Sequence, residues 1–410
     1  MTDKTPEASP GLAGLLNRRF ISLLVVSFLS SFVSSPLYSL LPVYVDRALL
    51  RPPIFSGFLK ALFLILGGLF AVPAGMLCDT LGIKRVFLLG ILGPLLAGCV
   101  FLTGDPYLLT ALCIGLGITF GFSSTGGQSY LLGAVAPSVL GIASAGYFLG
   151  STLGTASGSL FAGPIADNMG YEALGHTALI AALCLVAGAA MIVPSLPRST
   201  ETPPSAMRSL AGYLALLRRR EVRLLLGIRY LPTCYWGIVT LLIPLLISRI
   251  SGTNTSATTY TAISLTVAGG FQILTGRLCD RIGRWRPILT AATCVAVSAL
   301  GLTLTGHTLL GLYIFGVVAS ASAWSLSTTM PGLLQITAHE GEKGRVVGIA
   351  HVAWSAGMLS GNLGGGKLIE WGAALPFGIG FILCVGAVAC GIGLYRFHRA
   401  TDTPDAARGE

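Results

Sequence analysis

Long apolar runs, separated by short polar breaks, cover most of this 410-residue chain. Each run holds about 20 or more residues, which is the length that an α-helix needs to cross a bilayer. The runs are continuous rather than alternating, which disfavours a membrane β-barrel. The pattern therefore predicts an all-α polytopic membrane protein with twelve transmembrane helices. One of them ends near Ile247, and the others lie at about residues 20–45, 54–78, 86–103, 107–134, 141–164, 175–194, 258–279, 287–305, 309–337, 346–368 and 374–396.

Polar segments divide the chain into two bundles. Residues 195–222 are rich in proline and arginine and predict a linker between the six helices of residues 20–194 and the six of residues 223–396. Residues 1–19 and 397–410 are polar and predict terminal tails.

The second bundle repeats the first. At an offset of 202, Pro42 falls on Pro244, and at an offset of 207, Gly154 falls on Gly361. Such repeats predict two pseudo-symmetric halves related by an axis along the membrane normal, with a central binding site.

One hydrophilic hairpin also occurs twice, once in each half. In each copy the first glycine permits close helix approach, the aspartate can cap or bridge a neighbouring helix end, and the second glycine makes the turn. The basic residues that follow suit an anionic membrane face. The two copies contain Gly75, Asp79, Gly82, Lys84 and Arg85, and Gly276, Asp280, Gly283 and Arg284.

These hairpins resemble the signature loop of the major facilitator superfamily, with Trp285 in place of the second basic residue of the second copy. The resemblance covers about residues 17–396 and implies a twelve-helix transporter. It further implies that both loops act as a conformational gate, in which Asp79 and Asp280 hold their side of the protein closed.

Helix 5 partly resembles the antiporter motif of that superfamily. Ser159 and Asp167 stand where glycines are expected, and the resemblance favours export only slightly. The matching residues are Gly150, Gly154, Gly163 and Pro164.

Composition supports the membrane assignment, because 53% of the residues are hydrophobic and only 10% are charged. A soluble protein carries roughly 25% charged residues. The net charge is +10, and if the N-terminus is cytoplasmic, 20 of the 26 Lys and Arg residues fall on cytoplasmic segments, which indicates orientation rather than binding to nucleic acid. We therefore expect an inner (plasma) membrane protein with both termini cytoplasmic. Six of the 26 Lys and Arg residues lie elsewhere: Arg47, Arg51, Lys60, Arg229, Arg249 and Lys367.

Arg229 is the most informative candidate for substrate binding, because an arginine about two turns inside a membrane helix is costly unless it is paired or hydrated. It either extends to the surface or faces a central cavity, where it would bind an anionic or hydrogen-bonding group. Lys60 is ambiguous, since a lysine there could reach the outer surface. Further candidates that would line the cavity are Tyr38, Gln128, Tyr230, Trp236, Trp324, His351 and Trp354.

Several absences narrow the function. No Asp or Glu lies in the middle of a predicted helix, which weakens a standard proton-coupled drug pump. We expect facilitated diffusion, solute exchange, or proton coupling that depends on His351. The sequence has no phosphate-binding loop for ATP, no metal-ligand spacing among its nine cysteines and no nucleophile–base pair, so we expect no cofactor and no enzymatic activity.

We therefore predict a monomeric secondary active or facilitative transporter of a small polar or anionic organic solute, working by alternating access, with efflux slightly favoured. The alternatives are a multidrug-type exporter and, more remotely, a non-transporting receptor or assembly factor.

Overall fold

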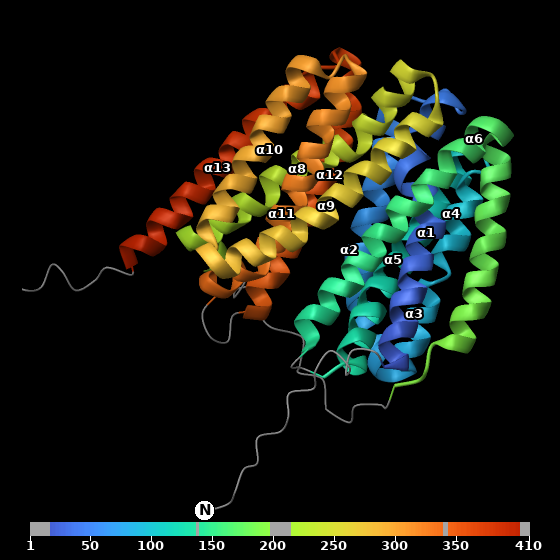
Figure 1. The fold of residues 1–410 in the computed structure, drawn as a ribbon, viewed down its shortest axis with the longest axis horizontal. Helices are drawn as coiled ribbons and strands as arrows, with labels where there is room; N and C mark the ends of the chain where they lie inside the picture. The colour runs from blue at the N-terminus through green and yellow to red at the C-terminus, as the bar shows by residue number, and fades with distance from the viewer. Residues whose placement is uncertain (1–16, 137–138, 197–214, 339–342, 402–410) are drawn as a thin grey trace, which may run out of the picture.

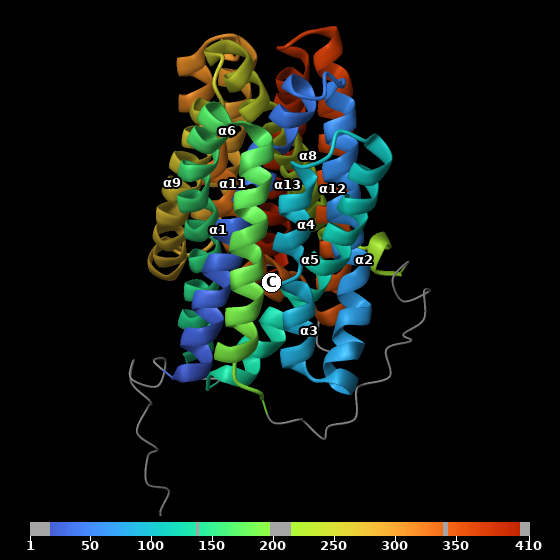
Figure 2. The same ribbon diagram turned by 90° about the vertical axis from the view of Figure 1, so that its right-hand side faces the viewer.

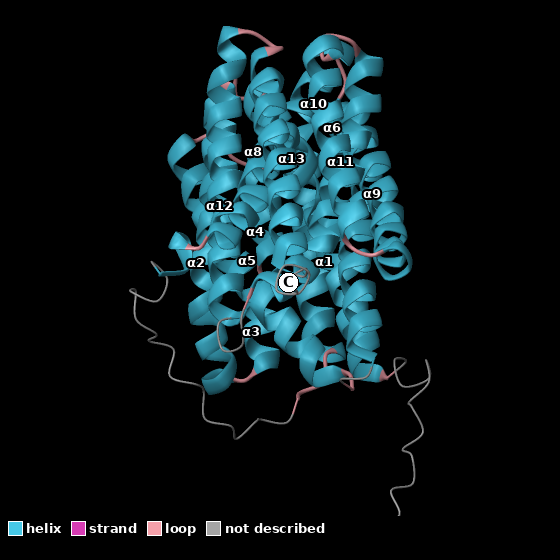
Figure 3. Ribbon diagram, turned by 90° about the vertical axis from the view of Figure 1, so that its left-hand side faces the viewer, coloured by secondary structure: helices cyan, strands magenta, loops and turns pink. Residues whose placement is uncertain are grey.

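A computed structural model describes residues 17–136, 139–196, 215–338 and 343–401, in which every regular element is helical (Figures 1 and 3). The first half comprises α1 (Arg18–Arg47), α2 (Pro53–Leu81), α3 (Ile83–Gly90), α4 (Gly93–Val100), α5 (Pro106–Ala134) and α6 (Leu140–Ile192). The second comprises α8 (Arg220–Ser251), α9 (Asn254–Ile282), α10 (Trp285–Thr305), α11 (Leu309–Thr337), α12 (Lys343–Leu368), η3 (Ile369–Trp371) and α13 (Leu375–Thr401).

The described helices are long and apolar enough for twelve crossings of a membrane. By length and composition, 11 helical segments can cross, with α3 and α4 together forming one of them. The longest, α6, turns back at Gly170 (φ 87°, ψ 168°), and each side of that break is long enough to cross alone. The expected loop between helices 5 and 6 is thus reduced to one glycine, which adopts a backbone conformation that other residues resist.

The predicted helix 3 is also interrupted. α3 ends at Gly90 and α4 begins at Gly93, so the break lies immediately before Pro94. A proline lacks the N–H that would bond the carbonyl four residues earlier, here that of Gly90, so a break at this point is expected.

The two halves lie side by side in Figure 1, and in Figure 2 the helices of the first half face the viewer. The helices of the two halves pair in equivalent ways. α1 packs on α6 as α8 packs on α12, and α2 packs on α5 as α9 packs on α11. Between the halves, α6 packs on α9 and α2 packs on α12. The predicted linker and tails lie largely outside the described residues, although α8 begins at Arg220, within the range predicted as linker.

Both hairpins form turns at the same end of the bundle, which we call the signature end; the opposite end is the far end. Gly82 (φ 93°) and Gly283 (φ 78°) adopt the left-handed backbone that the turn requires. At Gly75 and Gly276, however, an added Cβ would meet nothing closer than 4.0 Å. The close helix approach expected at these two positions is therefore not present in this conformation.

α8 is the most interior helix. Of its most apolar window, 89% is buried, against 22–50% for the other spans. Every residue of 237–248 is buried, and so is every residue of 39–45 in the equivalent part of α1. A helix that is buried on all sides is enclosed by other helices. The far end is therefore packed shut around α1 and α8.

Candidate functional site

Reciprocal contacts join the far ends of α1 and α8. The guanidinium of Arg249 donates two hydrogen bonds to the carboxylate of Asp46, the one from Nε being 2.9 Å long. Arg47 donates to Ser248 Oγ at 3.0 Å. At the repeat offset of 202, Arg47 corresponds to Arg249 and Asp46 to Ser248, so the two contacts are related by the pseudo-symmetry. The Arg249 side chain is 41% exposed, and an ion pair in such a setting contributes at most about 1 kcal/mol.

A stronger contact links α6 to α9. One carboxylate oxygen of Asp167 accepts from the backbone N–H of Asn254 at 2.8 Å. The other oxygen accepts from the N–H of Thr255 at 2.8 Å and from its hydroxyl at 2.6 Å. Tyr171 donates to the side-chain oxygen of Asn254 at 2.6 Å. Because α9 begins at Asn254, a carboxylate from the first half caps a helix of the second, where it also opposes the positive end of the helix dipole.

Gly163 allows these two helices to meet. A Cβ at this position would collide with the hydroxyl of Thr258 and the backbone of Thr255 on α9. At the second contact between the halves, where α2 packs on α12, a Cβ at Gly57 of α2 would likewise collide with the backbone of Asn362 on α12. Small residues at both seams let the backbones approach closely, as is typical of membrane helix contacts.

Lys60 lies deeper, at the boundary between the halves. Its side chain is buried, with 8% of the residue exposed, and Nζ donates to the backbone carbonyl of Thr240 at 2.7 Å. Nζ also lies 5.7 Å from the centre of the Tyr38 ring, within cation–π range. The possibility that Lys60 reaches the outer surface is therefore not realised in this structure.

Next to Lys60 is a cavity of about 20 Å³, enough for one water molecule. Tyr38 and Thr240, the two groups that contact Lys60, both line it. The cavity is bounded by aromatic rings and hydroxyl groups from α1, α8, α9 and α11, including those of Tyr38, Trp236, Thr240, Tyr260, Ser264 and Ser320.

Arg229 lies on the same face of α8. Residues 229, 233, 236 and 240 follow helical spacing, so Arg229 shares a face with Trp236 and Thr240, about 16 Å from Thr240 toward the signature end. Its guanidinium is partly exposed and makes no hydrogen bond or ion pair with another described residue. Toward the far end this face adjoins the other half, because Trp236 and Thr240 line the small cavity together with Tyr38, whereas Thr233, nearer Arg229, lies against Gly357 of α12.

Three of the other candidates lie near Arg229, on α8 and α12. His351 is exposed, its charge can interact with that of Arg229, and its ring centre is 6.3 Å from that of Trp354. Tyr230 donates to Ser360 at 3.0 Å, within its own half. Arg229, Tyr230, His351 and Trp354 form what we call the vestibule cluster.

Two candidates join neither the vestibule cluster nor the small cavity through an identified contact. Gln128 is exposed and donates to Ser124 one turn earlier on α5. The indole N–H of Trp324 is buried and has no hydrogen-bond partner among the described residues. In the helix-5 motif, Gly154 lies against the backbone of Phe28 on α1, whereas a Cβ at Gly150 would have ordinary contacts only. Pro164 is half-buried beside Gly163.

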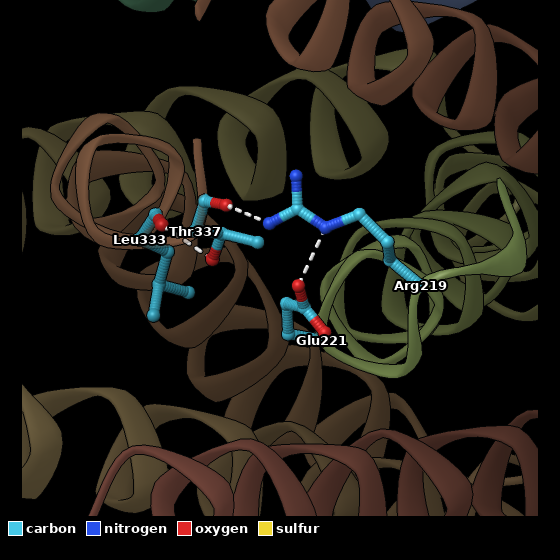
Figure 4. Close-up of polar contacts among 4 residues, drawn as sticks. All are labelled: Arg219, Glu221, Leu333 and Thr337. Atoms are coloured by element: carbon cyan, nitrogen blue, oxygen red, sulfur yellow. Dashed lines mark hydrogen bonds and ion pairs between the residues drawn. The ribbon is translucent and has the colours of Figure 1, made fainter. Parts of the chain in front are cut away.

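At the signature end, the polar contacts identified among the described residues stay within one half. Lys84 donates to the Ala190 carbonyl at 3.2 Å, and Arg284 donates to the Gly332 carbonyl at 2.8 Å. Arg219 bonds both Glu221 and the Thr337 carbonyl at the end of α11 (Figure 4). Cations at these helix ends are favoured by the helix dipole.

The signature carboxylates have no such partners. Asp79 and Asp280 are exposed, and neither makes a hydrogen bond or ion pair with a described residue. The halves are thus joined by polar contacts at the far end but not by these two aspartates. The gating role expected for them stays a prediction.

No group of three or more His, Cys, Asp or Glu side chains in the described ranges is arranged to hold a metal ion. The site therefore consists of cations, aromatic rings and hydroxyl groups.

Comparison with known proteins identifies the fold family. The family model of the Major Facilitator Superfamily matches residues 23–361. The chain belongs to this superfamily. Over 140 residues it is 31% identical to the uncharacterized MFS-type transporter YhhS of Escherichia coli strain K12, and equally to that of Shigella flexneri. That match covers 32% of this chain and only 35% of either relative.

Two solved structures have the same fold. A mutant of the nucleoside transporter NupG superposes with a TM-score of 0.74 at 13% identity, covering 93% of this chain and 99% of NupG. A POT family transporter in complex with 5-aminolevulinic acid gives 0.73 at 13% identity, with coverages of 93% and 96%. At this identity the likeness establishes the superfamily fold alone.

Reasoning from the sequence missed Asp167 as a cross-half contact. In the sequence, Asp167 stands out only as a departure from the helix-5 motif, where a glycine is expected. A weak signal was available, since the run Thr253-Asn254-Thr255 after Gly252 is typical of a helix start that needs a cap. Nothing in the sequence indicates that the cap comes from the other half.

We predict that Asp167→Ala shifts the conformational equilibrium toward a state open at the far end. The lost charge-assisted bonds are worth roughly 1.5–3 kcal/mol, which corresponds to about a 10- to 100-fold change in the ratio of the two states. A single cysteine at Thr261, buried beneath the far-end contacts, should then react about tenfold faster or more with an impermeant thiol reagent applied from the far side.

Asp105→Ala is the matched control. Asp105 caps α5 within its own half, accepting from the N–H of Leu108 at 2.7 Å. This variant should lose stability without exposing the Thr261→Cys position. Equal exposure in both variants would show that Asp167 does not hold the halves together.

Proposed function

We propose that this membrane transporter of the Major Facilitator Superfamily moves a small polar or anionic organic solute by alternating access. One observation carries the proposal: polar contacts and a fully buried stretch of α8 close the far end, while the cation-bearing face of the same helix lies between the halves. An alternating-access cycle requires a state in which contacts between the halves close one end of the protein.

The positions of the basic residues indicate which end of the protein faces the cytoplasm. Lys84, Arg85, Arg284 and their neighbours gather at the signature end, and positive residues concentrate on cytoplasmic loops. On this basis the signature end is cytoplasmic, both termini lie on that side, and the conformation faces inward. The compartment is then the inner (plasma) membrane.

The charge of the site favours an anionic solute. Lys60 and Arg229 lie in the interior or on the face between the halves, whereas the described carboxylates lie near the ends of the crossings. A guanidinium and an ammonium without a neighbouring carboxylate attract anions. A multidrug-type exporter of cationic compounds is less well supported, because it would need acidic groups there.

The proposal also covers the direction of solute transport and its coupling to protons or to a second solute. The helix-5 resemblance slightly favours efflux. Gly163 lies at the far-end seam, where it supports closure of the inward-facing state. For coupling we propose facilitated diffusion or exchange, or proton coupling that depends on His351, which lies beside Arg229. A receptor that does not transport would show no solute flux.

Alternating access predicts that bridging the far ends stops transport. In a background without native cysteines, Asp46→Cys and Arg249→Cys should be joined by a short, reducible bifunctional thiol reagent. Flux of benzenesulfonate, a permanently charged organic anion, into proteoliposomes should fall nearly to background and return when the bridge is reduced. The matched control bridges Glu172→Cys to His176→Cys, a pair one turn apart within one half, and should leave flux unchanged. Full flux through protein with the Asp46–Arg249 bridge would contradict alternating access.

Arg229 should contribute to recognition of the anion. Arg229→Ala should raise the KM for benzenesulfonate flux by about tenfold or more, since a charge-assisted bond is worth roughly 1.5–3 kcal/mol. Arg229→Lys keeps the charge but loses the planar fork, so its KM should be intermediate. Arg286→Ala, at an exposed basic residue of the signature end, is the control. An unchanged KM in Arg229→Ala would show that this residue does not bind the solute.

A further inference from the structure

Lys60 is bonded far less completely than a buried amino group requires. Its terminal nitrogen can donate three hydrogen bonds when charged, and the structure gives it one acceptor, the Thr240 carbonyl. The Tyr38 ring adds a weaker attraction, and no carboxylate pairs with Lys60 among the described residues. Burying an amino group with so few partners inside a membrane is costly, and such groups mark functional sites.

The one acceptor is itself a product of the sequence. Residue 244 is proline, so it has no N–H with which to bond the Thr240 carbonyl four residues earlier in α8. That carbonyl is consequently free to bond a partner outside its helix. Lys60 of α2, in the other half, supplies this partner. The bond therefore joins the two halves near the closed far end.

We propose that Lys60 binds the anionic group of the transported solute, which replaces the Thr240 carbonyl as the partner of the amino group. This inference rests on the proposed function and names the substrate class of the same site. An anionic oxygen is a stronger acceptor for a lysine than a neutral carbonyl, so the exchange is favourable.

The residues around Lys60 indicate the chemistry of the rest of the ligand. The cavity beside Lys60 is lined by the rings of Tyr38, Trp236 and Tyr260 and by the hydroxyls of Ser264 and Ser320. This lining suits a small organic anion with a flat apolar body. Because the cavity holds only about one water molecule in this conformation, such a ligand enters only when the rings that line the cavity move apart and Lys60 leaves Thr240.

Binding and conformational change are thereby connected. The anion removes one of the bonds that tie the halves together, so it stabilises the far-end-closed state less than a state open at the far end. Arg229 is about 16 Å away along α8, too far to share a single small anionic group with Lys60. The solute therefore meets the two cations in sequence. Arg229, in the vestibule cluster, is met first, and Lys60, nearer the closed far end, is met second.

Benzenesulfonate, which stays charged at every working pH, tests this assignment against its neutral isostere benzenesulfonamide. In purified protein, benzenesulfonate should raise the melting temperature in a saturable way, and benzenesulfonamide should not. Lys60→Met should weaken the apparent affinity by about tenfold or more, and Lys60→Arg should retain most of it. Lys367→Met, at an exposed lysine paired with Glu370, is the control and should bind normally.

Equal affinity in Lys60→Met and wild type, or no stabilisation of the wild type by benzenesulfonate, would overturn the assignment. Should Lys60→Met fail to fold, Lys60→Gln gives the same comparison, because its amide can still donate to Thr240. Flux separates this inference from the proposed function. Transport that persists equally in wild type and Lys60→Met removes only the role of Lys60, whereas binding that depends on Lys60 without any flux removes the proposed function and leaves the site.

Discussion

A helix that begins in one half of this protein is completed by a carboxylate from the other. The first N–H groups of any helix need acceptors from outside it. For α9, Asp167 accepts from the N–H groups of Asn254 and Thr255, and its charge interacts favourably with the helix dipole, while Thr253 accepts from the N–H of Ser256. Separating the halves at the far end replaces the charge-assisted bonds of Asp167 with bonds to water, so the cap favours closure of that end.

The other far-end contacts depend on the close approach that the cap maintains. The Arg249–Asp46 pair is partly exposed and contributes little alone, and the Arg47–Ser248 bond is a single contact. Between them the buried segment of α8 excludes water, and beneath them Lys60 bonds a carbonyl that Pro244 leaves free. The same region thus combines the closure of one end with the charged group that we propose receives the solute. A ligand that competes for Lys60 therefore acts directly on the balance between conformations.

The sequence predicted the features that repeat or that depend on local geometry. The superfamily fold is confirmed, and the turn glycines Gly82 and Gly283 adopt the backbone that their position in the hairpin indicated. Pro42 and Pro244 lie in the equivalent helices α1 and α8. The site was less accessible to prediction, because Asp167 and Lys60 acquire their roles from contacts across the halves. Pro244 indicates from the sequence that the Thr240 carbonyl is free, but only the tertiary structure shows that this carbonyl lies opposite Lys60.

The central claim is that far-end contacts, led by the Asp167 cap, set the balance between a state closed at the far end and a state open there. Spin labels at the equivalent exposed positions Ala48 and Ile250 report the far end, and labels at Leu81 and Ile282 report the signature end. Distances measured by pulsed electron resonance in wild type and Asp167→Ala test the claim most directly. We predict that the variant lengthens the far-end distance and shortens the signature-end distance together. A longer far-end distance with an unchanged signature end, or no change at either end, would contradict the account.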